Sequence, residues 1–186
     1  MPKLAKIVQR LRIVFYKLAS DCRNTTGSPK RRQPLLITGK GCVSFGRGVE
    51  LGVFPSPGFY NTYAHIESRG KQASISIGDN VMINNNCFIC SEGAGVTIGS
   101  DCLIGHNVQI FDSDFHHLAP DMRRTGLPAT AKVIIGRNVF IGANVIISKG
   151  VHIGDNCVLG TGAIVTRSIP ANTTAAGNPA TVIKTL

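Results

Sequence analysis

The sequence predicts an all-β chain folded as a parallel β-helix, because aliphatic residues recur every six positions over most of its length. Small or β-branched residues stand four places after most of these aliphatics, and Gly, Asn or Asp commonly lie between them. A period of six fits neither an α-helix nor an alternating strand, whereas a solenoid explains it. The main run consists of Ile77, Ile83, Ile89, Ile98, Ile104, Ile110, Ile135, Ile141, Ile147, Ile153, Leu159 and Val165.

Each repeat is expected to supply one short strand and one corner of a triangular coil. The aliphatic side chain points inward and stacks on its equivalent in the next coil, at roughly the 4.8 Å spacing of hydrogen-bonded strands. Corners need backbone angles that Gly, Asn and Asp tolerate. The predicted corner residues are Asn80, Asn86, Asp101, Asn107, Asn138, Asn144 and Asn156.

A fainter register precedes the main run. Gly39, Phe45 and Leu51 are six apart, which predicts a first coil. Residues 53–74 fit the repeat poorly and indicate coil with insertions. We therefore expect a β-helix domain over residues 36–186, with coils to about residue 176 and a tail over 177–186.

Residues 1–35 are expected to form a separate N-terminal segment. Leu4, Ile7, Val8, Leu11, Phe15 and Leu18 have helical spacing with basic residues opposite, which predicts an amphipathic helix over residues 4–18. We expect its apolar face to be buried against the β-helix or a neighbouring subunit. The alternative is contact with an anionic membrane. Residues 22–34 are expected to be a linker.

Cysteine usage and hydropathy favour a cytoplasmic protein. Lys6, Arg10 and Arg12 interrupt the first apolar stretch, so no secretory leader is expected. No apolar run is long enough to span a bilayer. The scattered cysteines predict free, mostly buried thiols rather than a disulfide framework; they are Cys22, Cys42, Cys87, Cys90, Cys102 and Cys157.

The net charge of +10 is concentrated at the N-terminus. Residues 1–32 carry nine bases and one acid, whereas the remaining 154 residues carry eleven bases and nine acids. The predicted β-helix is therefore nearly neutral, which argues against a nucleic-acid-binding body.

The gap between Ile110 and Ile135 marks a protruding loop over about residues 112–131. Continuing the repeat would place Asp114 inward, and a buried unpaired carboxylate is costly. The chain should leave the coil here, carrying the adjacent pair His116 and His117. Long loops on rigid scaffolds commonly carry function, and a neutral imidazole suits proton abstraction near neutral pH.

Together, the repeats, the segment from Asp112 to Pro120 and the ending from Ala175 to Ala180 resemble the hexapeptide-repeat acetyltransferases. The resemblance is closest to galactoside and maltose O-acetyltransferases and to bacterial polysaccharide O-acetyltransferases. It implies a left-handed coil, a homotrimer, and acetyl-CoA bound as co-substrate in a groove between subunits. No metal is implied.

The resemblance implies that His116 is the catalytic base. His117 stands where the family usually has Pro, and Ala119 stands where it often has Asp. Asp112 and Asp114 are candidates to orient the imidazole, together with His117, although loop turns also use such residues. The acceptor would contact Asn84, Asn86 and Glu92, of which the two asparagines also suit plain corners.

Coenzyme A is implied to run along the coils beyond the loop. Its pantetheine would meet backbone near Gly142, Ala143, Gly160 and Thr161, where small residues allow close approach. Its phosphates would need Thr166, Arg167 and Lys184, whose alternative role is as surface residues.

The favoured function is O-acetylation of a sugar or glycan in surface polysaccharide synthesis. The runner-up is N-acetylation of an amino sugar, which could be nucleotide-linked. Two other classes are a zinc-dependent carbonic-anhydrase-like β-helix, with His106 joining the loop histidines, and a non-catalytic scaffold. The identity of the sugar does not follow from the residues.

Overall fold

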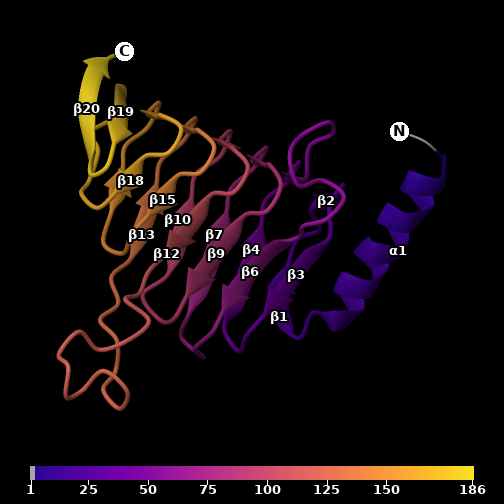
Figure 1. Ribbon diagram of the computed structural model, residues 1–186, viewed down its shortest axis with the longest axis horizontal. Coiled ribbons are helices and arrows are strands. Elements are labelled where there is room, and N and C mark those ends of the chain that lie inside the picture. The colour runs from indigo at the N-terminus through magenta and orange to yellow at the C-terminus, as the bar shows by residue number, and fades with distance from the viewer. Residues whose placement is uncertain (1–2) are drawn as a thin grey trace.

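A computed structural model describes residues 3–186, and its strands stack into one three-sided solenoid (Figure 1). The first sheet contains β1 (Asn24–Thr26), β4 (Cys42–Phe45), β7 (Ser74–Ile77), β10 (Val96–Ile98), β13 (Val133–Ile135) and β16 (His152–Ile153). The second contains β2 (Lys30–Arg31), β5 (Glu50–Leu51), β8 (Met82–Ile83), β11 (Leu103–Ile104), β14 (Phe140–Ile141), β17 (Val158–Leu159), β19 (Thr173–Gly177) and β20 (Ala180–Thr185). The third contains β3 (Leu35–Thr38), β6 (Ala64–Ser68), β9 (Phe88–Ser91), β12 (Gln109–Phe111), β15 (Ile146–Ile147) and β18 (Ile164–Val165).

The predicted inward positions form the core. Ile77, Ile98, Ile104, Ile135, Ile141 and Ile153 are all buried, and each strand pair is in parallel register with its equivalent one coil away. The small residues at the second inward position, including Cys87, Cys102 and Cys157, are buried as well. Burial raises the pKa of the Cys87 thiol to about 12, which fits an unreactive core residue.

The predicted corner residues adopt the left-handed backbone conformation. All seven have a positive φ, from 53° at Asn138 to 65° at Asp101. Their side chains also stack between coils, since Asn86 donates to Asn107, and Asn107 donates to Asn144. The repeat thus selects Asn both for its backbone tolerance and for a hydrogen-bonded ladder along the corner.

The expected linker over residues 22–34 is wrong. β1 pairs with β4 and β2 pairs with β5, so these residues form the first coil of the solenoid. The expected first coil at Phe45 and Leu51 is therefore the second. The predicted tail over 177–186 is also structured, since β20 folds back antiparallel on β19.

The helix α1 (Lys3–Ala19) confirms the predicted helix but not its expected packing. It lies at the end of the solenoid opposite the β19–β20 hairpin (Figure 1) and contacts β3. Most of its apolar residues are exposed, with Ile13 half-buried, whereas Gln9 is buried. Over residues 3–186, no helix is long and apolar enough to cross a membrane.

Residues 52–63 form an insertion between β5 and β6. The buried Asn85 holds it by accepting from Val53 N at 3.1 Å and donating to carbonyls of the insertion, including Pro57 O at 3.0 Å. Buried Gln33 donates to Thr62 Oγ1 at 2.7 Å. These amides explain why residues 53–63 depart from the repeat without disturbing the coils around them.

Candidate functional site

The predicted loop leaves the solenoid between β12 and β13 and projects away from it (Figure 1). Its neck is closed by backbone pairing: Ala131 N donates to Asp112 O at 2.8 Å, and Asp114 N donates to Ala129 O at 3.1 Å. An antiparallel bridge joins Ser113 and Thr130 between them. The loop therefore starts from a fixed base on the third sheet.

Asp112 anchors that base. Its carboxylate is fully buried and accepts four hydrogen bonds, from Ser91 Oγ at 2.7 Å and from the backbone N–H groups of Glu92 at 2.7 Å, Gly93 at 3.3 Å and Gly95 at 2.6 Å. These donors lie at the end of β9 and in the turn that follows it. Asp112 thus ties the loop to the preceding coil, and its oxygens face that turn rather than the histidines.

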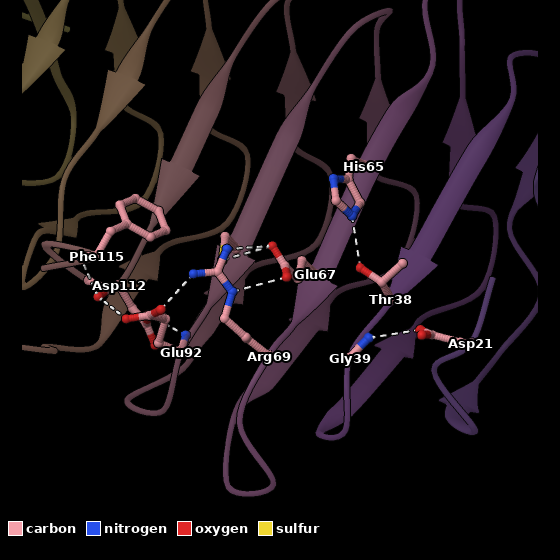
Figure 2. A network of polar contacts seen from close by, with 11 residues as sticks. Asp21, Thr38, Gly39, His65, Glu67, Arg69, Glu92, Asp112 and Phe115 are labelled. Carbon is pink, nitrogen blue, oxygen red and sulfur yellow. Dashed lines mark hydrogen bonds and ion pairs between the residues drawn. The ribbon is translucent and has the colours of Figure 1, made fainter. Parts of the chain in front are cut away.

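A charged network continues from this turn across the edge of the third sheet. Figure 2 shows Arg69 between Glu67 and Glu92, with ion-pair distances of 2.9 and 2.6 Å. Arg69 lowers the pKa of Glu67 by hydrogen bonding, and the two carboxylates raise the pKa of Arg69. The other oxygen of Glu92 accepts a short hydrogen bond from Ser113 Oγ.

The network reaches the residue before His116. Phe115 has a φ of 62°, a left-handed conformation that is costly for an aromatic residue. Its N–H donates to Ser113 Oγ at 2.9 Å, and its ring lies under the Arg69 guanidinium, 5.3 Å from ring centroid to Cζ. Glu92, Ser113 and Arg69 together therefore hold the backbone from which His116 projects.

The two histidines have different surroundings. His117 is half-buried, its Nδ1 accepts from Ala119 N at 3.2 Å, and its Cβ lies where Gly126 leaves room. His116 is exposed, and none of the described residues hydrogen-bonds its ring. His117 braces the loop, whereas the imidazole of His116 is available for a substrate.

Asp114 pairs with a neighbouring coil rather than with an imidazole. Its Oδ2 lies 3.3 Å from Lys149 Nζ, an ion pair without hydrogen-bond geometry. No hydrogen bond joins Asp112 or Asp114 to a histidine within residues 3–186. Neither carboxylate therefore makes the hydrogen bond to an imidazole that the expected orienting role would need.

A cavity of about 380 Å³ lies between the loop and the two preceding turns. Arg69, Glu92, Leu127 and Thr130 are among its lining residues. Charged side chains line it on the sheet side, and Leu127 and Pro128 line it on the loop side, a combination of polar and apolar groups that is common in ligand pockets. Sequence reasoning had found Glu92, but it missed Glu67, Arg69, Ser113 and Phe115.

The predicted acceptor residues are not brought together in one chain. Glu92 follows β9, whereas Asn84 and Asn86 precede it, at the opposite end of that strand. Asn86 belongs to the corner ladder, and Asn84 Oδ1 accepts from Asn85 N at 2.7 Å. Asn84 lines a separate cavity of about 200 Å³ with Met82, Leu103 and Phe140.

The predicted coenzyme A residues also divide between two corners. Gly142, Ala143, Gly160 and Thr161 follow strands of the second sheet, and Lys184 lies on β20 in that sheet. Thr166 and Arg167 follow β18 of the third sheet, on the corner from which the loop leaves. The fold itself also favours a glycine at position 142, because a Cβ there would lie 2.7 Å from Thr161 N of the next coil.

His106, His116 and His117 do not form a metal-ligand cluster. Within the described part of the chain, no group of three or more His, Cys, Asp or Glu side chains is placed to hold a metal ion. Residues 3–186 of one chain alone therefore do not supply the three ligands that a zinc site needs.

Comparisons with known proteins agree with the fold, and the matched repeats fall on both sides of the loop. The family model described as hexapeptide repeat of succinyl-transferase matches residues 95–110 and 132–167. Nodulation protein L of Rhizobium leguminosarum bv. viciae is 41% identical over 155 residues, which cover 83% of this chain and 73% of that protein. The WbbJ protein of Escherichia coli K12, provisionally assigned as a lipopolysaccharide biosynthesis O-acetyltransferase, is 34% identical over 92% of this chain and 81% of its own length. The chain belongs to the hexapeptide-repeat acetyltransferases.

Solved structures of this family share the fold. A hexapeptide-repeat acetyltransferase from Vibrio cholerae, solved with acetyl-coenzyme A, has 30% identity and a TM-score of 0.61 over 76% of this chain and 70% of that chain. The polysialic acid O-acetyltransferase OatWY has 25% identity and a TM-score of 0.66 over 87% of this chain and 75% of that chain. The predicted left-handed parallel β-helix is confirmed. The chain spans 60% of the length of a Saccharomyces cerevisiae relative, with 41% identity over 128 residues, or 69% of this chain.

Proposed function

We propose that this chain transfers an acetyl group from acetyl-CoA to a hydroxyl group of a sugar, in the synthesis of a surface polysaccharide. The observation that carries the proposal is the imidazole of His116, which is exposed and projects from a braced loop, while other residues of that loop line a cavity with Arg69 and Glu92. Relatives named as O-acetyltransferases support the reaction class, and WbbJ supports a polysaccharide acceptor. An amino-sugar acceptor is the alternative outcome of the experiment below.

The proposed reaction needs one base and one acyl donor. His116 takes the proton of the acceptor hydroxyl as its oxygen forms a C–O bond to the thioester carbonyl carbon. The C–S bond then breaks, and the imidazolium returns the proton to the departing thiolate. Such general-base catalysis is typically worth about 10²–10⁴-fold.

The proposed path of acetyl-CoA follows the coils beyond the loop. Thr161 is exposed and Gly160 is half-buried at this corner, whereas Gly142 is buried against the next coil. Exposed Arg167 and Lys184 are the candidate phosphate contacts. Replacing both with Glu should weaken acetyl-CoA binding, and unchanged affinity by calorimetry would remove these two residues from the proposal.

A complete site requires a second copy of the chain, because the candidate residues divide between two corners of one solenoid. We propose the homotrimer that the family resemblance implies. An exposed apolar column on the second sheet supports self-association: Met82, Leu103 and Phe140 are in register on successive coils and are 41%, 48% and 50% exposed. Light scattering should give three times the chain mass, and Phe140→Glu should lower it; a monomeric wild-type chain would contradict the proposal.

The direct experiment is release of free thiol from acetyl-CoA in the presence of free, nucleotide-linked and lipid-linked sugars. We expect release with a hydroxyl acceptor, and we expect the acetylated product to lose its acetyl group to hydroxylamine, as an ester does. A product resistant to hydroxylamine would be an amide and would favour the amino-sugar alternative. No thiol release with any acceptor would contradict the proposed function.

A further inference from the structure

The side of α1 that contacts the solenoid is polar. Buried Gln9 donates to Arg32 O at 3.1 Å and to Phe59 O at 3.0 Å. Arg12, one helical turn further on, donates to Thr62 O at 2.7 Å and to Tyr60 O. Tyr16 continues this side and packs against Tyr63 with ring centroids 4.7 Å apart. Defined hydrogen bonds thus fix the rotation of α1 on the solenoid.

This rotation leaves the apolar side of α1 without a partner among residues 3–186. Leu4, Leu11, Phe15 and Leu18 are 73%, 65%, 64% and 80% exposed. Ile7, Val8 and Val14 on the same side are also exposed. A continuous apolar stripe of this length on a helix normally marks a contact surface.

A row of bases borders the stripe. Lys6, Arg10 and Lys17 are spaced by four and seven residues, so they share one side of the helix, and all three are exposed. The helix Lys3–Ala19 contains no acidic residue. An apolar stripe with unpaired bases beside it suits a membrane interface, where apolar acyl chains lie beneath negatively charged headgroups.

We propose that α1 docks this protein on an anionic phospholipid surface, with the stripe at the headgroup boundary and the row of bases at lipid phosphates. The inference goes beyond acetyl transfer and does not depend on it. A second copy of the chain is the less suitable occupant, because residues 1–32 of each copy carry nine bases and one acid and would repel. The remaining 154 residues carry eleven bases and nine acids, so they offer no net negative charge to balance the bases of residues 1–32.

The proposal is tested by sedimentation of the full chain with vesicles of phosphatidylcholine alone or with about one third phosphatidylglycerol, without acetyl-CoA. We expect binding to the mixed vesicles only, and weaker binding as salt increases. The combined Leu11→Ser and Phe15→Ser variant should not sediment. Lys6→Gln, Arg10→Gln and Lys17→Gln should each weaken binding roughly fivefold, since one base near an anionic surface contributes about that factor.

Matched control variants distinguish binding through α1 from non-specific electrostatic or hydrophobic adsorption to the vesicles. Arg137→Gln removes an exposed base, and Ile183→Ser removes an exposed apolar side chain at the far end of the solenoid; both should sediment like the wild type. Circular dichroism checks that the Leu11→Ser and Phe15→Ser chain is folded. Failure of the wild type to bind the mixed vesicles would overturn the proposal. So would a fall in oligomer mass of that double variant by light scattering, since the stripe would then belong to a second copy.

Discussion

Replacing Asp112 with Asn separates a structural role at the loop neck from a catalytic one. The carboxylate is fully buried and accepts four hydrogen bonds, three of them at one oxygen. An Asn can keep that oxygen, but its amide group then faces the N–H of Glu92, which loses its acceptor. One buried donor is left unpaired and three bonds lose their charge, so we expect a loss of roughly 3 kcal/mol in unfolding free energy.

That loss should lower the melting temperature by about 5–10 °C for a chain of this size. Circular dichroism during heating measures it, and Asp121→Asn on the exposed part of the loop is the matched control with no expected change. Well below the melting temperature, acetyl transfer should fall by less than about tenfold. An unchanged melting temperature with a hundredfold loss of turnover would refute this reasoning and restore Asp112 as an orienting group for the histidine.

Three further predictions concern the solenoid and the charged network. Ile141→Ala removes a fully buried core side chain and should cost about 2–5 kcal/mol of unfolding free energy, measured by urea titration; a loss below 1 kcal/mol would mean that the stack closes around the gap. Gly142→Ala places a Cβ 2.7 Å from backbone of the next coil and should cost about 1–3 kcal/mol, whereas Gly93→Ala meets nothing within 4 Å and should cost less; equal losses would contradict the close approach. Because Arg69 lowers the pKa of Glu67, this carboxylate stabilises the fold above its unfolded pKa of about 4.3, and that contribution should disappear as the pH falls further. In Glu67→Gln, the melting temperature should therefore fall less steeply with pH on the acid side than in the wild type. The same pH dependence in both proteins would contradict a stabilising Arg69–Glu67 pair.

The core could be predicted from the sequence because one physical requirement repeats in every coil. Each repeat has one buried aliphatic residue and one corner residue with a left-handed backbone, and both recur every six residues. Ile104 and Asn107 therefore follow the same rule as Ile141 and Asn144. The loop could be predicted for the converse reason, since Asp114 would break the rule. Family resemblance then selected His116 over His117, and this choice stays a prediction; His116 is exposed, whereas His117 accepts a hydrogen bond from Ala119 N.

The remaining features depend on contacts between residues that the six-residue repeat does not reveal. Strands β1 and β2 have three and two residues and contain Lys30 and Arg31, so they resemble a linker until the second coil pairs with them. The packing side of α1 depends on Gln9 and Arg12 finding carbonyl oxygens in distant turns. The role of Asp112 depends on a turn one coil away, which the spacing of the aliphatic residues does not connect with this position.

The most direct test of the proposed chemistry is a comparison of His116→Ala with His117→Ala, measuring turnover, acetyl-CoA affinity and melting temperature for each. His116→Ala should lower turnover at least about a hundredfold while acetyl-CoA still binds and the melting temperature is unchanged. His117→Ala should lower the melting temperature, because the N–H of Ala119 loses its acceptor, and should cost less turnover. The reverse order of the two turnover losses would make His117 the base, and full activity in both variants would contradict catalysis by this loop.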